Sequence, residues 1–583
     1  MTRSGRSPSE AAPGPTVSQE TSDTVGQTLG VLARFYPWAV RPSEQLREAV
    51  STLESDVAPE TVVRAGYGAG LLAGMLAATL ALVTVGLLAT VPGAVLGLAV
   101  VHVVHSAPLV VARVRQTATL GDGPALISRL VLRMRLSSTP ERAAAFAAAS
   151  GEGLLAERLA VHVRRAEHTG RSGLERFGEA WAEPFPPLAR AVALVGAAGS
   201  APADDRERVL DRALVTVLDG TRERMREFAA DIRGPTTALY AFGVLLPTAL
   251  VALLPAGAAA GVAIAPVTVV FTYNLLLPAM LVAASAWLLS QRPVAFPPPE
   301  LGDHPDADTG DGAVVAGFVV GVTAWVGTAP TFPGWAPPVS AVGLGCGVAL
   351  WLRYRSLVGV YSEIHAAERE LGDALALAGR RVATGQAVET AVAETGEELD
   401  GPIGDAFQGC TRRQRQLQVG VREALLGPHG ALDRLPSPRI HTSVALLALA
   451  ADEGRQAGEA LLSLSDHVEK LRRVRREADH NLAHVCRTLS STAMLFGPLV
   501  AGATVALADG MAGEAFGGGE VSLGWLGAPV GVYVLVLAVV LTALATALRR
   551  GLDGPLVGYR VGRALGCATV AYLCSYLLVR VVA

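Results

Sequence analysis

The hydrophobic residues of this chain fall in long blocks separated by polar stretches. Many blocks approach or exceed about 20 residues, the length that a helix needs to cross a bilayer. The blocks predict nine membrane-spanning helices, and "TVPGA" forms a tight turn between the first two. The predicted spans cover residues 66–89, 92–112, 237–255, 262–290, 313–333, 338–352, 488–508, 526–548 and 563–582.

The two longest polar stretches, 113–236 and 353–487, repeat apolar residues every three or four positions, which predicts amphipathic helices. Alternating runs typical of strands are missing, so we expect an all-α protein in which each polar stretch folds as a helical bundle with its own core. The clearest apolar stripes are Leu461, Leu464, Val468, Leu471, Val474, Ala478, Leu482 and Val485, and Leu210, Leu214, Val217, Met225, Phe228 and Ile232.

These patterns predict ten segments along the chain. They are an N-terminal cytoplasmic segment (1–64), a transmembrane hairpin (65–112), a first cytoplasmic bundle (113–236), helices three and four (237–290), an acidic Pro-rich linker (291–312), helices five and six (313–352), a second cytoplasmic bundle (353–487), helices seven and eight (488–548), a basic loop (549–562) and helix nine (563–583).

Composition supports a membrane protein that crosses the bilayer several times. Hydrophobic residues make up 51% of the 583 residues, charged residues 17%, and the mean hydropathy is +0.40. Soluble domains usually contain about 25% charged residues. Residues 1–22 are rich in Ser, Pro, Gly and Glu, which predicts disorder, and they lack the apolar core of a signal peptide.

Arginine placement predicts the orientation of the chain. The two long polar stretches and the loop 549–563 carry most of the arginines, whereas the loop 509–520 has none. Basic residues are retained on the cytoplasmic side of a membrane. We therefore expect the N-terminus inside, the C-terminus outside and both polar bundles in the cytoplasm. The acidic linker 291–312 also falls inside, although carboxylates contribute little to this rule.

The chain is predicted to be an internal duplication with an offset near 250 residues. Each half has two spans, a polar bundle and two further spans, and one extra span follows. "RMREFAAD" (224–231) matches "VRREADHN" (474–481), and Pro247 matches Pro498. The halves contain an even number of spans, so they run in the same direction, as parallel repeats do in some transporters.

An arginine-rich helix leads directly into the seventh predicted span. "DHVEKLRRVRREADHNLAHVCR" (466–487) has one apolar face and one basic face, and we expect it to continue into the span that follows. Such a helix could transmit movement of the bundle into the membrane. Alternatively, its arginines are ordinary anchors that contact lipid headgroups.

The chain resembles the type II secretion F-domain family, and within it the archaeal type IV pilus and archaellum platform proteins, the TadC/FlaJ-like group. The residues that carry the resemblance are "ERELGDALALAGRRVATGQAVETAVAETG" (368–396), "ALLALAADEGRQAGEALLSLSDHVEKLRRVRREA" (445–478) and "FGPLVAG" (496–502). A more diverged copy is "ALISRLVLRMRLSSTPERAAAFAAAS" (125–150). The resemblance covers roughly residues 120–255 and 365–505.

The resemblance implies a non-catalytic membrane platform on which a cytoplasmic hexameric secretion ATPase works to assemble pilin-like subunits. Membrane lipids are further partners, a nucleic acid is not, and no cofactor is expected. The filament, the choice between assembly and retraction, and the choice between monomer and homodimer stay open. As residues that dock the ATPase we select Arg472, Arg473, Arg475, Arg476, Arg224 and Arg226.

The sequence lacks the common catalytic motifs. It has no G-x-x-x-x-G-K-[ST] phosphate loop, so the energy source must be a partner. His480 and His484 have the spacing of a zinc protease motif, but Asn481 follows where the glutamate is needed. His102 and His105 lie in the second span without a carboxylate, which favours packing over a proton or metal site.

Cysteine and glycine patterns also favour structural roles. Cys346, Cys410, Cys486, Cys567 and Cys574 contain no C-x-x-C, which speaks against a disulfide or zinc framework. "GLGCG" (343–347) resembles a nucleotide loop but lies inside a span. We expect close helix packing there, as at Gly66, Gly70 and Gly74, and at Gly558, Gly562 and Gly566.

A secondary transporter or permease built from two parallel repeats is the main alternative. Transporters that couple to ions usually keep ionisable residues inside the bilayer. The predicted spans hold no Asp, Glu, Lys or Arg away from their ends. This absence favours a platform, and a signalling protein would need a kinase, cyclase or phosphorelay motif that the sequence does not contain.

Overall fold

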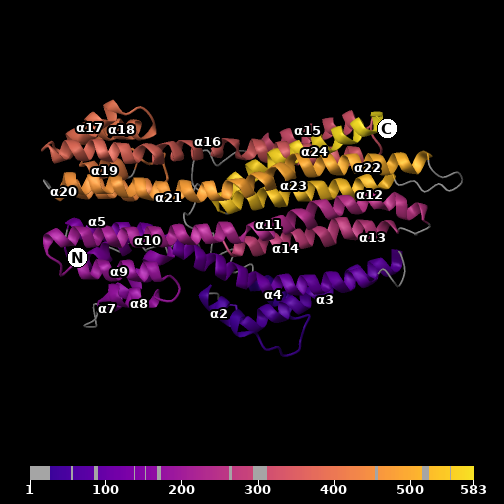
Figure 1. Ribbon diagram of the computed structural model, residues 1–583, viewed down its shortest axis with the longest axis horizontal. Helices are drawn as coiled ribbons and strands as arrows, with labels where there is room; N and C mark the ends of the chain where they lie inside the picture. Colours follow the sequence, from indigo (N-terminus) through magenta and orange to yellow (C-terminus); the bar gives the residue numbers. More distant parts are fainter. Residues whose placement is uncertain are drawn as a thin grey trace, which may run out of the picture. The chain divides into compact units, whose positions relative to one another are not determined.

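The protein is helical throughout the part of the chain that its computed structural model describes (Figure 1). The structure is 87% helical, and no strand occurs in the described residues, which confirms the prediction of an all-α membrane protein. Residues 1–25, which include the stretch 1–22 predicted to be disordered, and most of the acidic linker lie outside those residues. Described are residues 26–53, 57–84, 90–136, 138–151, 153–166, 172–260, 265–292, 312–427, 429–453, 457–514, 524–551 and 553–582.

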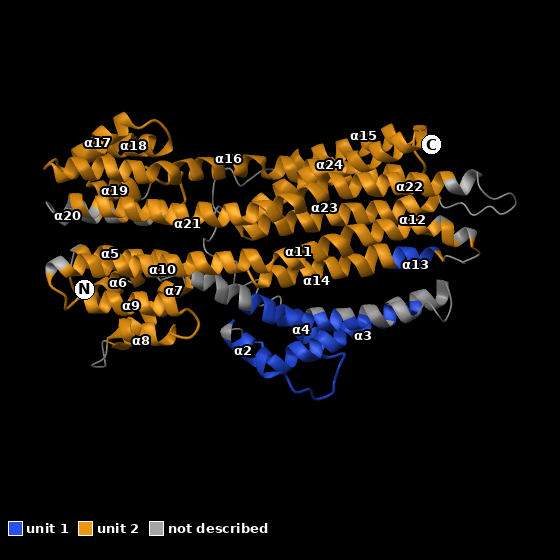
Figure 2. Cartoon of the chain, in the orientation of Figure 1, with its two compact units in different colours: residues 1–115, 266–271 blue, residues 116–265, 272–583 orange. Residues whose placement is uncertain are grey.

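The chain divides into two compact units (Figure 2), residues 1–115 with 266–271 and residues 116–265 with 272–583. Unit 1 contains α2 (Glu44–Thr52), α3 (Pro59–Thr84), α4 (Thr90–Gly121, as far as Arg115) and α13 (Pro266–Phe271). Helices α3 and α4 approach closely, because a Cβ on Gly70 would lie only 2.6 Å from the Gly97 carbonyl oxygen. The close packing predicted at the first glycine series is confirmed.

The first polar bundle, in unit 2, consists of six helices. They are α5 (Gly123–Leu136), α6 (Pro140–Ser150), α7 (Leu154–Ala166), α8 (Gly173–Ala180), α9 (Pro186–Ala198) and α10 (Ala203–Asp231). Its core includes Leu159, Phe177 and Leu214, all with no exposed surface. The predicted stripe on α10 and its continuation is confirmed, because Leu210, Leu214, Val217, Met225, Phe228 and Ile232 are all buried.

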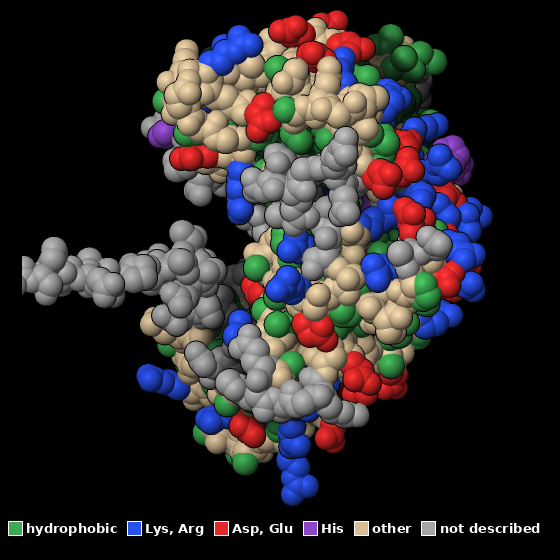
Figure 3. Space-filling view, turned by 90° about the vertical axis from the view of Figure 1, so that its left-hand side faces the viewer, with side chains coloured by type: hydrophobic (Ala, Val, Ile, Leu, Met, Phe, Trp, Pro, Cys, Tyr) green, Lys and Arg blue, Asp and Glu red, His purple; other side chains and the backbone are tan. Residues whose placement is uncertain are grey.

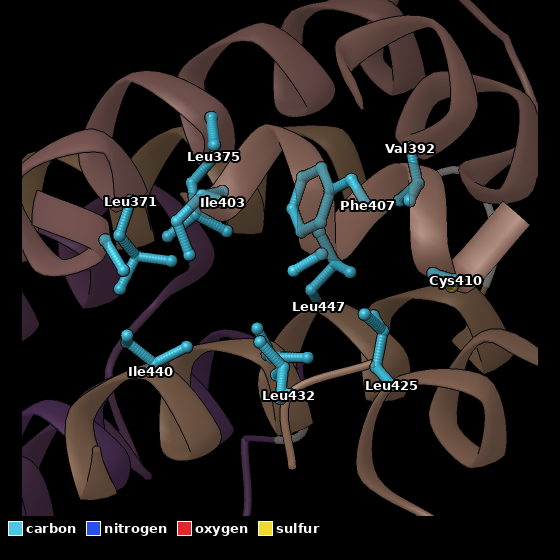
Figure 4. Close-up of a cluster of buried hydrophobic side chains, with 14 of the residues drawn as sticks. Leu371, Leu375, Val392, Ile403, Phe407, Cys410, Leu425, Leu432, Ile440 and Leu447 are labelled. Carbon is cyan, nitrogen blue, oxygen red and sulfur yellow. The ribbon is translucent and has the colours of Figure 1, made fainter. Parts of the chain in front are cut away.

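The second polar bundle repeats this order of six helices. They are α16 (Ala336–Ala383), α17 (Val388–Glu398), α18 (Pro402–Leu417), α19 (Val421–Leu426), α20 (Pro438–Glu453) and α21 (Ala457–Ser491). Figure 4 shows Leu371 and Leu375 of α16, Phe407 of α18 and Ile440 of α20 facing one another across the core. On α21, Leu461, Leu464, Val474, Ala478, Leu482 and Val485 are buried as predicted, and Val468 and Leu471 are half-buried.

A local contact recurs in both bundles at the same offset. Gly401 has φ 115° at the start of α18, where Ile403 N donates to Glu370 Oε2 (3.3 Å). Gly153 has φ 96° at the start of α7, and a Cβ there would lie 2.7 Å from Asp122 Oδ2. Glu370 belongs to α16 and Asp122 directly precedes α5, and each carboxylate lies against a glycine with left-handed backbone. The recurrence is compatible with the predicted duplication, which stays a prediction.

Five described helices are long and apolar enough to cross a membrane. They are Asp205–Leu254, Pro266–Ser290, Leu461–Gly510, Gly524–Arg550 and Gly554–Val582, and they include the third, fourth, seventh, eighth and ninth predicted spans. Gly312–Thr328 (α15) and Val100–Ala112 are shorter apolar helices. Nine spans therefore remain a prediction.

Close packing of glycines joins α16 to its apolar neighbours. A Cβ on Gly345 would lie 3.0 Å from the Gly317 carbonyl oxygen of α15, and one on Gly347 would lie 2.9 Å from the Gly562 carbonyl oxygen of α24 (Gly554–Val582). The "GLGCG" stretch thus serves helix packing, as predicted. Gly562 and Gly558 also lie against α16, whereas Gly566 has open space around it.

Three prolines are each preceded by a short π-helix. The segments η2 (Ala241–Leu245), η3 (Thr272–Leu276) and η6 (Thr492–Phe496) end two residues before Pro247, Pro278 and Pro498. Proline cannot donate to the carbonyl four residues earlier, and its ring forces the backbone apart, so the helix widens locally. Tyr533 OH donates to the Gly243 carbonyl that Pro247 leaves unpaired within its helix.

Unit 2 also contains five further apolar helices and one 3₁₀ turn. They are α11 (Arg233–Tyr240), α12 (Leu246–Ala259), α14 (Leu277–Ser290), α22 (Gly497–Glu514), the 3₁₀ turn η7 (Gly524–Leu526) and α23 (Gly527–Arg550). Helix α12 packs on α22, and α14 packs on α23.

Candidate functional site

Two long helices connect the polar bundles to apolar spans. Residues 205–254 and 461–510 each form one helix of 50 residues. The first comprises α10, α11, η2 and α12, and the second comprises α21, η6 and α22. The expected continuation of the 461–485 helix into the seventh span is confirmed. Each helix has its π-helical widening after the bundle, within the first turns of the predicted span, and a helix bends readily at such a point.

Charged side chains join these helices at equivalent positions. Arg222 Nε lies 2.9 Å from Glu477 Oε2, and Arg226 Nε donates to Glu477 Oε1 (3.0 Å). Arg226 and Glu477 are 251 residues apart, the offset that also separates Pro247 from Pro498. The two halves therefore meet through corresponding parts of their long helices.

The hydrophobic cores of the two bundles also interlock. Leu471 and Val474 of α21 pack against the core of the first bundle. In return, Leu132 of α5 is buried in the core of the second bundle. Movement of one bundle relative to the other would have to break both these apolar contacts and the ion pairs on Glu477.

Glu368 is the centre of a partly buried polar cluster in the second bundle. Its Oε2 lies 3.1 Å from Arg475 Nη1 and 3.3 Å from Arg439 Nη1, and Ser437 Oγ donates to its Oε1 (2.9 Å). Its fourth neighbour is His365, whose Nδ1 lies 3.6 Å from Oε2. The cluster connects α16, the start of α20 and α21.

Burial and charge act in opposite directions on this cluster. Burial by itself raises the pKa of Glu368, but the hydrogen bond with His365 and the charges of Arg439 and Arg475 outweigh it and lower the pKa to about 2. Burial lowers the pKa of Arg439 to about 10, and the neighbouring Arg475 adds to this effect. Both groups remain charged at neutral pH, so each depends on the other for its counter-charge.

The cluster extends to the end of α23. Arg550 Nη1 donates to His365 Nε2 (2.6 Å), which places His365 between Arg550 and Glu368. Arg292, which follows α14, donates from Nε to the Leu548 carbonyl (2.8 Å), so a second arginine contacts the last turn of α23. Polar contacts thus tie the second bundle to an apolar helix.

The six arginines selected from the sequence lie in different surroundings. Arg475 is bound to Glu368, Arg226 to Glu477, and Arg224 Nη2 to the Pro184 carbonyl (2.8 Å). Arg226 therefore joins the two bundles, whereas Arg475 stabilises the second bundle and Arg224 the first.

The other three selected arginines belong to the surface of α21. Arg472 Nη1 donates to the Arg369 carbonyl (3.1 Å), whereas Arg476 forms an ion pair with Glu469 of its own helix and is 59% exposed. Arg473 is also exposed. On the end of the molecule that carries the bundles, arginines and carboxylates are interspersed (Figure 3). Arg226 is also exposed (51%) but joins the two bundles through Glu477, so Arg473 and Arg476 are the selected arginines that are exposed without bridging the bundles in the described residues.

The histidine pairs noted in the sequence do not form a metal site in the described residues, where no group of three possible ligands occurs. His105 Nε2 lies 3.1 Å from the Val63 carbonyl oxygen and its ring packs on Tyr67, whereas His102 is exposed. His480 and His484 are exposed on α21.

Sequence reasoning selected Arg475 but missed the other residues around Glu368. His365 and Glu368 are three apart on a helix, which is a common spacing for surface pairs. Ser437 and Arg439 are about 70 residues away in the chain. No local signal distinguishes such a buried cluster from exposed charge, because its members meet only when α16, α20 and α21 pack together.

Together the long apolar helices, their polar bundles and the missing strands in the described residues define a helical, multi-pass membrane protein. Residues 374–504 match the family model described as type II secretion system (T2SS), protein F. The chain therefore contains a domain of the type II secretion F family, which confirms that resemblance. The match begins near the end of α16, covers most of the second bundle and ends in α22. No curated protein and no solved structure matched the chain.

Proposed function

We propose that this protein is a non-catalytic membrane platform of a type IV pilus-like machine. The match to the type II secretion F family carries the proposal, because it includes both the second bundle and the helix that joins this bundle to a span. The cell membrane is the proposed location, and an archaeal pilus or archaellum is the proposed machine.

In the proposed mechanism, a cytoplasmic hexameric ATPase docks on the polar bundles and its motion reaches the apolar helices, where pilin-like subunits are added. The two 50-residue helices are suited to this role because they continue from bundle to span. The ion pairs on Glu477 and the interlocked cores would make the bundles respond together. The contact from Arg550 through His365 to Glu368 offers a second connection to the membrane.

The proposed topology places the N-terminus and both bundles in the cytoplasm and the C-terminus outside. Single cysteines at Gly196, Gly420 and Gly510, in a variant without native cysteines, test it, because an added Cβ at each glycine meets nothing within 4 Å. In intact cells an impermeant thiol reagent should label the Gly510→Cys variant only. Labelling of the Gly196→Cys or Gly420→Cys variant, with a membrane shown to be intact, would contradict this orientation.

Docking of the ATPase is expected to depend on Arg473 and Arg476. Reversing both charges, as Arg473→Glu with Arg476→Glu, should reduce recovery of the ATPase in pull-down from solubilised membranes several-fold, most strongly at low salt, because exposed charges are screened by salt. Filament counts on the same cells should fall. Arg475 is left unchanged, because its loss would disturb the Glu368 cluster instead.

A matched control reverses two exposed arginines on α18, Arg412 and Arg415. Membrane levels and the cysteine-labelling pattern of both variants must equal those of the parent protein. Normal ATPase recovery and normal filaments in the α21 variant would show that Arg473 and Arg476 are lipid anchors or solvent-exposed residues, and would reject them as docking residues.

A further inference from the structure

Four arginines gather where α23 ends at Arg550 and α24 begins at Gly554. Arg292 is 7% exposed and donates to the carbonyls of Leu548 (2.8 Å) and Arg549 (3.4 Å), so it lies against the end of α23. The charges of Arg549 and Arg550 act on Arg560 of α24. We call Arg292, Arg549, Arg550 and Arg560 the basic junction.

Carboxylates do not neutralise the basic junction within the described part of the chain. None of its arginines forms an ion pair with Asp or Glu there, and the Nε atoms of Arg549 and Arg550 are buried without a hydrogen-bond partner. Glu368 is already bound by the guanidinium groups of Arg439 and Arg475, and Asp553 Oδ1 accepts from Leu556 N (3.2 Å). The charge of Asp479 reaches Arg292 and Arg550, which leaves a clear positive excess.

Such an excess is costly away from bulk water. Buried charges destabilise a protein unless they are paired, and like charges add repulsion. Burial lowers the pKa of Arg292 to about 10, which shows that its surroundings disfavour the cation. A guanidinium group binds phosphate through two parallel hydrogen bonds, so a phosphate group would satisfy several of these donors at once.

The position of the basic junction selects the source of the phosphate. Gly524–Arg550 and Gly554–Val582 are both helices that can cross a membrane, and the junction lies where one ends and the next begins. Lipid headgroups occupy this depth on either side of a bilayer. We propose that the basic junction binds the phosphate of an anionic phospholipid and that this lipid fixes the α23–α24 turn against α14.

The proposal is tested with the full-length protein purified in a neutral detergent. Phosphatidylglycerol is expected to raise the midpoint of thermal unfolding, whereas phosphatidylcholine should raise it much less. The variant Arg549→Gln with Arg560→Gln should bind phosphatidylglycerol at least about tenfold more weakly, because each charge-assisted hydrogen bond contributes about a tenfold factor or more. Arg292 is left unchanged because it supports the backbone of α23.

Two further variants separate binding from folding. Arg549→Lys with Arg560→Lys retains the charge but cannot form the two parallel hydrogen bonds of a guanidinium group. Phosphatidylglycerol should therefore raise its unfolding midpoint by an intermediate amount. Arg415→Gln removes an exposed charge on α18 and should respond like the parent protein. Equal lipid responses in the parent protein and the double Gln variant would overturn the proposal, as would an equal effect of millimolar inorganic phosphate, which would identify a site for free anions.

The acidic linker that follows Arg292 provides one more decisive comparison. It contains Glu300, Asp303, Asp306, Asp308 and Asp311. Replacing these five residues by Gln and Asn should leave the response to phosphatidylglycerol unchanged or make it stronger. A response that appears only after this replacement would overturn the proposal, because the linker rather than a lipid would then neutralise the junction in the native chain.

Discussion

Replacing Glu368 by Gln is expected to lower the free energy of unfolding by about 3 kcal/mol, the lower end of the loss on removing one partner from a buried ion pair, because these side chains are only partly buried. The amide can still accept from Ser437, but Arg439 and Arg475 lose their shared counter-charge. The midpoint of thermal unfolding in detergent measures the change. The loss should be accompanied by easier proteolysis of the second bundle.

The pH dependence of stability provides a second test of how much the Glu368 carboxylate stabilises the fold. The folded pKa of Glu368 is about 2 and its ordinary value is 4.5, a difference that corresponds to about 3 kcal/mol. Because the folded pKa is lowered, this stabilisation is fully present above pH 4.5 and is lost as the pH falls toward 2. The difference in stability between the parent protein and the Glu368→Gln variant should therefore shrink over this interval.

Glu363 provides the matched control, because it lies on the same helix and is exposed. The Glu363→Gln variant should unfold within about 0.5 kcal/mol of the parent protein. Adding Arg439→Met to the Glu368→Gln variant should recover part of the lost stability, because it removes one uncompensated buried charge. If Glu368→Gln were as mild as Glu363→Gln, the cluster would not be an energetic centre of the bundle.

Replacing Gly562 by Ala is expected to separate α24 from α16. The added Cβ would lie 2.6 Å from Trp351 N and 2.7 Å from the Gly347 carbonyl oxygen, and backbone atoms cannot move aside as a flexible side chain can. Overpacking of this kind usually costs about 1–3 kcal/mol. The Gly562→Ala variant should therefore unfold at a lower temperature in detergent.

Gly566, one turn later on α24, is the control for this substitution. A Cβ on Gly566 meets nothing within 4 Å, and alanine favours a helix over glycine by about 1 kcal/mol. The Gly566→Ala variant should be as stable as the parent protein or slightly more stable. Equal effects of the two substitutions would show that the contact between α16 and α24 does not depend on the missing side chain of Gly562.

Hydrophobic periodicity was a reliable guide to the fold because it reports a local property. A stripe such as Leu210, Leu214 and Val217 can be buried only on one face of a helix, and all three residues are buried. Similarly, small residues at intervals of four predicted close helix contacts, which occur at Gly70, Gly347 and Gly562. The number of spans stays a prediction, because length and apolarity alone single out five helices.

The sequence alone determined that the chain is helical, that apolar spans alternate with polar bundles, and that a secretion F-type region leads into a span. These properties depend on composition and on the period of the helix. Only the tertiary structure decided which charges have structural roles. Arg473 and Arg475 are nearly adjacent in the chain, yet Arg473 is exposed and Arg475 binds Glu368, 107 residues away. Because each residue is rotated by about 100° around the helix axis from the one before it, Arg473 and Arg475 point in nearly opposite directions. The packing of α16 against α21 covers the direction of Arg475 and leaves that of Arg473 exposed.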